Sequence, residues 1–117
     1  MGFQDNVPIY VQIADEIKQE IISGELDALD KLPSIREYSV RYQVTVLTIQ
    51  RAISLLESEG IITARKGVGS FVNPDAPARL RDGMVAEEVQ GFLRRMKKMG
   101  FNEEQILQQV KEGLSHE

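Results

Sequence analysis

The sequence predicts a mainly α-helical protein with one small β-hairpin, organised as a head over residues 1–74 and a helical tail over residues 75–117. Three observations lead to this fold class. Apolar residues recur at helical spacing in five separate stretches. Each stretch begins or ends at a residue that favours a helix terminus. Two short runs rich in β-branched and aromatic residues enclose a glycine-containing turn, which favours a hairpin.

The first expected helix follows Pro8, which suits a first helical turn because its missing N–H needs no partner there. Isoleucine occupies every fourth position from residue 9 to residue 21, and the charged residues lie off that stripe. Gly24 ends the helix, since glycine adopts the left-handed conformation easily. In the connection over residues 25–33 we expect three leucines to turn inward, namely Leu26, Leu29 and Leu32.

Two helices joined by a tight turn come next. Ser34 and Glu37 form a capping-box pattern, so a second helix is expected over residues 35–42. After a two-residue turn, Thr45 can cap a third helix over residues 46–58. One face of this third helix is apolar and comprises Ile49, Ala52, Ile53 and Leu56.

Residues 61–72 predict a short β-hairpin, because two β-rich runs flank a turn that contains two glycines. Residues 75–79 are expected to be a linker. Helical periodicity then predicts an amphipathic helix over residues 80–99. A last helix is expected after Asn102, which can form a capping box with Gln105.

The net charge of −4 argues at first against a nucleic-acid partner, but the charge is unevenly distributed. Residues 1–30 carry one basic and seven acidic side chains, whereas residues 31–73 carry six basic and three acidic ones. A local basic patch is what meets phosphates, so DNA stays a candidate partner despite the acidic total.

The residue types that several other functions need are missing. There is no cysteine, and the single histidine, His116, lies near the C-terminus, so we expect no metal site and no catalytic constellation. No nucleotide-binding loop is found, and we expect no cofactor and no enzyme activity. No apolar run reaches the ~20 residues of a membrane helix, and no signal peptide is apparent, so a cytoplasmic protein without membrane contact is expected.

The order of elements in the head is that of a winged helix-turn-helix, in which two short helices precede a hairpin. An α-helix fits the ~12 Å major groove of DNA and offers the side chains of its first turns to base edges. A hairpin with a glycine-containing tip can approach a sugar–phosphate backbone closely. We therefore expect the head to bind duplex DNA through the third helix and the hairpin.

Residues 8–72 resemble the GntR family of bacterial transcription regulators. The motifs that carry this resemblance are PIYVQIADEIKQEIISGEL, KLPSIRE, TIQRAISLLESEGII and ARKGVGSFV. The resemblance implies a winged helix-turn-helix that regulates transcription. The sequence departs from the family at Val46 and Leu47, where many members carry arginine or other polar residues. Gln43 replaces the usual glycine of the turn, and Tyr38-Ser39 replaces the usual Leu-Ala.

The resemblance also assigns DNA contacts. It implies that Arg36 reaches a phosphate or the groove edge, and that Thr45 and Thr48 meet phosphates or bases. Arg51 would pair with phosphate or guanine, and the cations next to the hairpin turn would meet the backbone. The full expected set is Ser34, Arg36, Thr45, Val46, Leu47, Thr48, Gln50, Arg51, Arg65, Lys66, Gly67 and Gly69.

Most of these residues have a purely structural alternative. Arg36 can pair with Glu37 or with an acidic residue of the first helix, and Thr45 can act only as an N-cap. Leu47 can touch a thymine methyl group, or it can make a core or dimer contact. For Gln50 the functional interpretation is a bidentate pair with adenine. The two glycines of the hairpin can serve the turn alone.

The tail is too short to enclose a typical ligand pocket of ~300 Å³ or more, so its apolar faces need a partner. It resembles the YtrA-type subgroup, in which a helical hairpin mediates dimerisation; the alternative is that it folds back on the head. No small-molecule effector can be named from the sequence. The expected dimerisation residues are Val85, Val89, Phe92, Leu93, Met96, Ile106, Leu107 and Val110.

The leading interpretation is therefore a repressor that binds a pseudo-palindromic operator as a homodimer, with half-sites about one helical turn apart. The alternative is a winged-helix protein-interaction module without DNA binding. The acidic first helix and the apolar pair Val46 and Leu47 favour that alternative.

Overall fold

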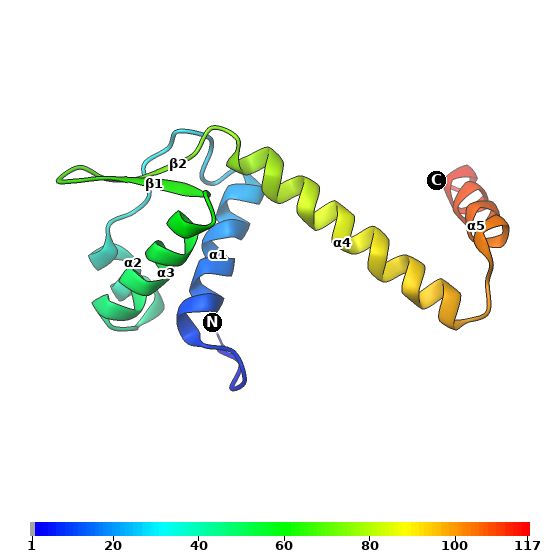
Figure 1. Ribbon diagram of the computed structural model, residues 1–117, viewed down its shortest axis with the longest axis horizontal. Coiled ribbons are helices and arrows are strands. Elements are labelled where there is room, and N and C mark those ends of the chain that lie inside the picture. Colours follow the sequence, from blue (N-terminus) through cyan, green and yellow to red (C-terminus); the bar gives the residue numbers. More distant parts are fainter. Residues whose placement is uncertain (1) are drawn as a thin grey trace. The chain divides into compact units, whose positions relative to one another are not determined.

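The computed structural model of the protein describes residues 2–117. Its elements are α1 (Ile9–Ser23), α2 (Ile35–Tyr42), α3 (Val46–Ser58), β1 (Ile62–Arg65), β2 (Gly69–Val72), α4 (Ala76–Lys98) and α5 (Glu103–Ser115) (Figure 1). The chain forms two compact units, here called the head and the tail. The head ends at Arg81 and the tail begins at Asp82, so the division falls within α4.

Helix α1 places most of the expected isoleucine stripe in the core of the head. Ile13, Ile17 and Ile21 are buried, whereas Ile9 in the first turn is 43% exposed. Pro8 is the N-cap residue rather than a member of the first turn. Gly24 has a φ of 90° and donates its N–H to the carbonyl oxygen of Ile21, which confirms the expected glycine C-cap.

The expected pair of helices with a tight turn is confirmed. The Ser34 hydroxyl accepts from the Glu37 N–H at 3.1 Å, and the Glu37 carboxylate accepts from the Ser34 N–H at 3.4 Å. In the turn, Gln43 takes the left-handed φ of 55°, a conformation that glycine adopts more easily. A side chain in that conformation costs roughly 1–2 kcal/mol, so the turn keeps its geometry at some cost in stability.

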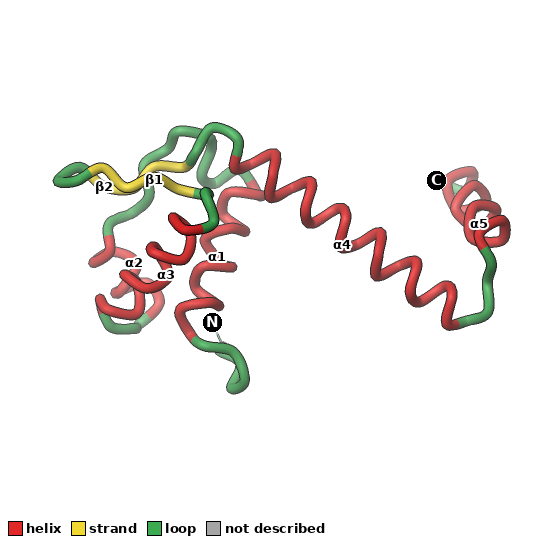
Figure 2. Tube along the Cα trace, in the orientation of Figure 1, coloured by secondary structure: helices red, strands yellow, loops and turns green. Residues whose placement is uncertain are grey.

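The core of the head lies between the three helices and the hairpin. Helices α1 and α2 both pack against α3, whose inner face buries Ile49, Ala52 and Leu56 completely. Figure 2 shows the hairpin running beside these helices, and its last residue, Val72, is 1% exposed. The burial of one face of α3 leaves the opposite face for contacts outside the head.

The hairpin is antiparallel, with Ile62 paired to Val72 and Arg65 paired to Gly69. A third segment, residues 29–32, runs beside β2. The Leu29 N–H donates to the Val72 carbonyl at 2.9 Å, and the Leu32 N–H donates to the Ser70 carbonyl at 2.8 Å. The expectation that all three leucines of this connection turn inward is wrong for Leu29. Its backbone has a φ of 71° and is hydrogen-bonded to β2. Its side chain is 67% exposed and does not enter the core.

The linker expected over residues 75–79 is also wrong. Helix α4 begins at Ala76, whose side chain is completely buried in the head. Arg79, one turn later, donates to the carbonyl oxygens of Gly60 and Glu59 at 3.1 and 3.2 Å. The first turn of α4 therefore belongs to the head. None of the described helices is both long and apolar enough to cross a membrane.

The tail consists of the rest of α4 and helix α5. Asn102 caps α5 through the expected capping box: its side chain accepts from the Gln105 N–H at 2.9 Å, and its N–H donates to Gln105 Oε1 at 2.8 Å. Ile106 is only 4% exposed, so part of the apolar face of α5 is covered within the tail. Five other aliphatic side chains are at least 40% exposed, namely Val85, Val89, Leu107, Val110 and Leu114.

Candidate nucleic-acid interface

Helix α3 presents an open face beside the hairpin. Gln50 and Arg51 are exposed and Thr48 is half-buried, while the residues that alternate with them fill the core. The apolar pair at the start of α3 also lies outside, since Val46 is 42% and Leu47 is 63% exposed. The Thr48 and Arg51 flank is therefore not used to pack the head and can face a ligand.

The N-terminus of α3 carries two hydroxyl groups in contact. Thr45 Oγ1 accepts from the Thr48 N–H at 3.2 Å and lies 2.9 Å from Thr48 Oγ1. Thr45 is thus the N-cap of α3, as expected. A helix N-terminus carries partial positive charge and favours an anion. The cap and a phosphate contact are compatible at this position.

Arg51 is held against an aromatic ring. Its guanidinium carbon lies 5.7 Å from the centroid of the half-buried Tyr10 ring on α1. Among residues 2–117, Arg51 makes no ion pair. The two side chains border a shallow, open depression that also includes Leu47, Gln50, Ser54, Leu55 and Ser58. Tyr10 therefore restricts where the unpaired charge of Arg51 can point.

Arg36 is exposed in the first turn of α2, and within the described chain it has no carboxylate partner. The Glu37 carboxylate is used by the capping box instead. The ion-pair alternative for Arg36 is not found among these residues. Arg41, not Arg36, reaches the acidic face of α1, where its Nη1 lies 2.7 Å from Glu20 Oε1.

Glu20 is the centre of a partly buried polar cluster between α1 and α2. Its carboxylate accepts from Arg41 and from the Tyr38 hydroxyl at 3.2 Å. Burial, together with the nearby charge of Glu20, raises the pKa of Tyr38 far above its ordinary range. Tyr38 is completely buried and keeps its hydroxyl bonded. The Glu20–Arg41 pair thus neutralises one acidic charge of α1 and one basic charge of α2, and among the described residues it leaves Arg36 and Arg51 without a carboxylate partner.

Residues 62–72 form the wing, the hairpin of β1, its turn and β2. The Arg65 guanidinium lies 4.9 Å from the centroid of the Phe71 ring, and Lys66 is exposed. Gly67 has a φ of 75° and faces open space. Gly69 has a φ of 142°, and a Cβ there would lie 2.7 Å from the Lys31 side chain. Both glycines are thus required by the backbone of the turn, whatever else they contact.

Lys31 is a candidate that the sequence argument missed. It pairs with Phe71 of β2 and lies across Gly69, so it brings a further cation to the wing. A cleft of about 350 Å³ separates the wing from α2 and α3 and is lined by Lys31, Leu32, Pro33, Ser34, Ile35, Arg36, Ile53, Val68, Gly69 and Ser70. The only signal for Lys31 in the sequence is that it precedes the Leu-Pro-Ser motif. Its place at the wing depends on the pairing of residues 29–32 with β2.

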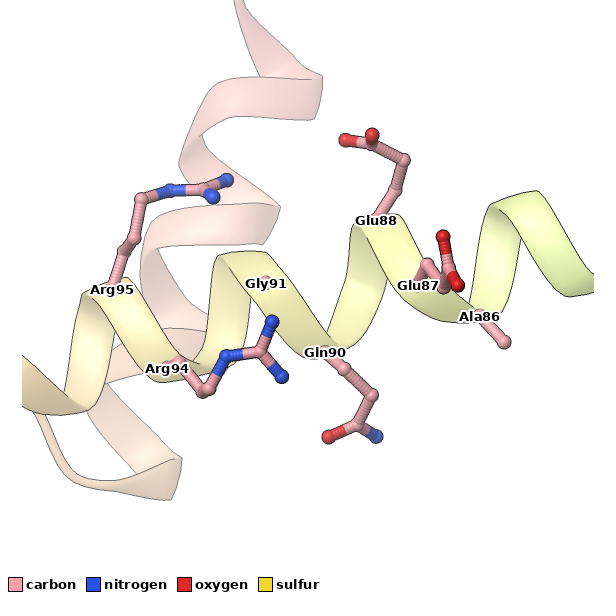
Figure 3. A pocket seen from close by; sticks show the side chains of 7 residues that line it. All are labelled: Ala86, Glu87, Glu88, Gln90, Gly91, Arg94 and Arg95. Carbon is pink, nitrogen blue, oxygen red and sulfur yellow. The ribbon is translucent and has the colours of Figure 1, made fainter. Parts of the chain in front are cut away.

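A further hollow, of about 620 Å³, lies on α4 of the tail (Figure 3). All seven lining residues come from one helix, and none is buried. A ligand pocket needs walls from several elements and a few convergent polar groups. This hollow is therefore an open surface and not a small-molecule site.

Comparisons with known proteins agree with this geometry. Residues 9–72 match the model of the bacterial regulatory proteins of the gntR family. The chain is 40% identical over 111 residues to the HTH-type transcriptional regulator YhcF of Bacillus subtilis, covering 93% of this chain and 92% of that protein. It is 30% identical over 112 residues to the HTH-type transcriptional repressor YtrA of Bacillus subtilis, covering 93% of this chain and 86% of that protein.

Two solved structures extend the match to the fold. A GntR family transcriptional regulator from Listeria monocytogenes superposes with a TM-score of 0.79 at 37% identity, covering 94% of this chain and 98% of that one. The DNA-binding domain of AraR in complex with operator ORX1 has a TM-score of 0.57 at 32% identity, covering 61% of this chain and 92% of that one. The expected winged helix-turn-helix is confirmed. The chain belongs to the GntR family of bacterial regulatory proteins.

Proposed function

We propose that this protein is a transcriptional repressor that binds a specific duplex DNA sequence as a homodimer in the cytoplasm. The observation that carries the proposal is the exposed face of α3, where Thr48, Gln50 and Arg51 lie beside a complete wing. The structure of the AraR domain with its operator supports DNA as the ligand. The relatives named as repressors, YtrA and NagR of Bacillus subtilis, support the direction of regulation.

The proposed DNA-contacting residues fall into two groups, one that reads base edges and one that contacts phosphates. Gln50 and Arg51 are placed for base edges in the major groove, where glutamine pairs with adenine and arginine with guanine. Val46 and Leu47 offer apolar contacts to thymine methyl groups. The remaining polar and basic groups serve the phosphates, which fix orientation without reading sequence. This second set comprises Ser34, Arg36, Thr45, Thr48, Arg65 and Lys66, with Gly67 and Gly69 shaping the wing.

Two arguments support a dimer, one from DNA affinity and one from the exposed apolar side chains of the tail. A single head makes few phosphate contacts, so its affinity at physiological salt is modest, and tethering two heads adds avidity. The tail also leaves Val85, Val89, Leu107 and Val110 at least 40% exposed, together with the half-buried Phe92, Leu93 and Met96. We infer that a second copy covers these side chains, and that the operator is pseudo-palindromic with half-sites about one helical turn apart.

Genomic selection tests the proposal. Purified full-length protein is incubated with sheared bacterial DNA, and the retained fragments are sequenced. We expect enrichment of one inverted-repeat motif, and loss of that enrichment in the double variant Arg36→Ala/Arg51→Ala. Equal recovery of all fragments by the protein and the variant would contradict the proposal.

The alternative, a winged-helix module that binds a protein, is favoured by one observation, the exposure of Val46 and Leu47 on α3. It predicts that Leu47→Asp abolishes capture of a protein partner while no DNA is retained. The repressor proposal predicts that the same substitution weakens retention of the selected DNA fragments.

A further inference from the structure

The tail carries its charges in two separate blocks along α4. Three carboxylates, Asp82, Glu87 and Glu88, precede Gly91, and four cations follow it, namely Arg94, Arg95, Lys97 and Lys98. Among the described residues, none of these seven side chains makes an ion pair. The open surface around Gly91 is where the two blocks meet (Figure 3).

The spacing within α4 prevents these charges from neutralising one another. Oppositely charged residues stabilise a helix when they are three or four positions apart. Glu88 has Val85, Met84, Gly91 and Phe92 at those distances, and Arg95 has no acidic residue at any of them. Arg94 instead meets Lys97 and Lys98, and like charges at this spacing destabilise a helix. The basic block therefore has no acidic residue of its own helix at pairing distance and stays available to a carboxylate from elsewhere.

Glu88 and Arg95 flank the apolar stripe of the same helix. The stripe has a heptad spacing of four, three and four residues and comprises Val85, Val89, Phe92 and Met96. Glu88 immediately precedes Val89, and Arg95 immediately precedes Met96. Figure 3 shows both side chains projecting from the same side of α4. In coiled coils, charges in these flanking positions set the partner and the orientation.

We propose that α4 pairs with α4 of a second copy in antiparallel orientation, about a two-fold axis between Gln90 and Gly91, with Glu88 of each copy beside Arg95 of the other. This inference rests on the proposed homodimer and specifies its register. In this register Val85 of one copy meets Met96 of the other, and Val89 meets Phe92. A parallel pair in register would instead place Glu88 beside Leu93 of the other copy, so the Glu88–Arg95 contact would not form.

The Glu88–Arg95 contacts determine which chain α4 pairs with, in addition to strengthening the dimer. An isologous two-fold interface forms the Glu88–Arg95 contact twice. A partner without a carboxylate and a cation at these two positions would lose both contacts, so the pairing favours self-association. We expect it to be screened at high salt, since both groups lie at the surface.

Charge reversal in the full-length protein tests the register. Glu88→Arg and Arg95→Glu should each raise the dimer dissociation constant by about tenfold or more, as two pairs are lost and two repulsions appear. An equimolar mixture of the two variants should form a heterodimer as tight as the wild type. The doubly exchanged variant Glu88→Arg/Arg95→Glu should also dimerise normally. Glu87→Arg and Arg94→Glu are the matched controls, because those residues point away from the stripe in this register.

Sedimentation of these variants separates the possible failures. A monomeric wild type would remove the homodimer and this register with it. A dimeric wild type with Glu88→Arg indistinguishable from Glu87→Arg would overturn the register alone. Since the chain has no cysteine, a disulfide gives a second measurement. Mixed Val85→Cys and Met96→Cys chains should cross-link to each other, whereas covalent dimers of Val85→Cys by itself would indicate a parallel pair.

Discussion

The guanidinium of Arg51 lies over the ring of Tyr10, 5.7 Å from its centroid, and thereby links the exposed face of α3 to α1. Tyr10 belongs to the Pro-Ile-Tyr motif at the start of α1, and Arg51 is the single cation of α3. The contact leaves the charge of Arg51 available for DNA and limits the conformations that binding must fix.

Replacement of Arg51 by alanine should weaken binding to the selected operator by ~1–3 kcal/mol, the range expected for one specific base contact. The side chain is exposed, so the thermal midpoint should change little. Fluorescence anisotropy with a labelled operator measures the effect. Lys111→Ala, an exposed cation of the tail, is the control and should bind as the wild type. Unchanged affinity in the Arg51 variant would remove this residue from the interface.

Tyr10→Leu should weaken operator binding by ~0.5–1 kcal/mol, because the ring no longer orients the guanidinium. Tyr10→Phe retains the ring and should retain the affinity. In a double-mutant cycle with Arg51→Ala, the Tyr10→Leu substitution should have no further effect. Additive losses in the double variant would mean that Tyr10 acts independently of Arg51.

Val89→Asp should dissociate the dimer, because it places a carboxylate in the apolar stripe of α4. Val89 is 49% exposed in the single chain, so the fold of the tail should tolerate the change. Sedimentation velocity would show a monomer. Val40→Asp on α2, at a position 79% exposed, is the matched control and should stay dimeric. A dimeric Val89→Asp protein would place the interface elsewhere.

Alkaline pH should destabilise the head through Tyr38. Its pKa is raised in the folded state by burial and by Glu20, whereas the unfolded chain ionises near pH 10. The stability contribution is therefore complete below ~pH 10 and is lost as pH rises, by up to about 1.4 kcal/mol per pH unit. Tyr38→Phe should lose about 1 kcal/mol at neutral pH but show a shallower alkaline decline. Burial also raises the pKa of Tyr42, so some pH dependence should remain. Urea unfolding at ~pH 8 to ~11 tests this, and an unchanged slope in the variant would contradict it.

Elements with local chemical signals were predictable from the sequence. Ser34, Thr45 and Asn102 each cap the helix that follows them, and the hydrogen bonds involved span three residues. The hairpin was marked by glycines that the backbone needs at positive φ. Such signals depend on nearest neighbours along the chain, so they can be recognised without the tertiary structure.

The features that were missed depend on contacts distant in sequence. Residues 75–79 were expected to be a linker, yet a helix starts at Ala76, whose side chain is buried in the core of the head. Lys31 joins the wing only through pairing with Phe71, forty residues later. The same limit applies to Leu29, whose backbone hydrogen bond to Val72 keeps its side chain outside. No periodicity in the sequence encodes these positions.

The salt dependence of binding to random duplex DNA tests the central claim, that the open face of α3 and the wing meet a phosphate backbone. We expect the logarithm of the association constant to fall linearly with the logarithm of the salt concentration, because neutralised phosphates release counterions. Lys66→Ala should reduce the slope by about one, as expected for one lost phosphate contact. A protein that binds no duplex at low salt, or whose slope is the same with and without Lys66 and Arg36, would contradict the account.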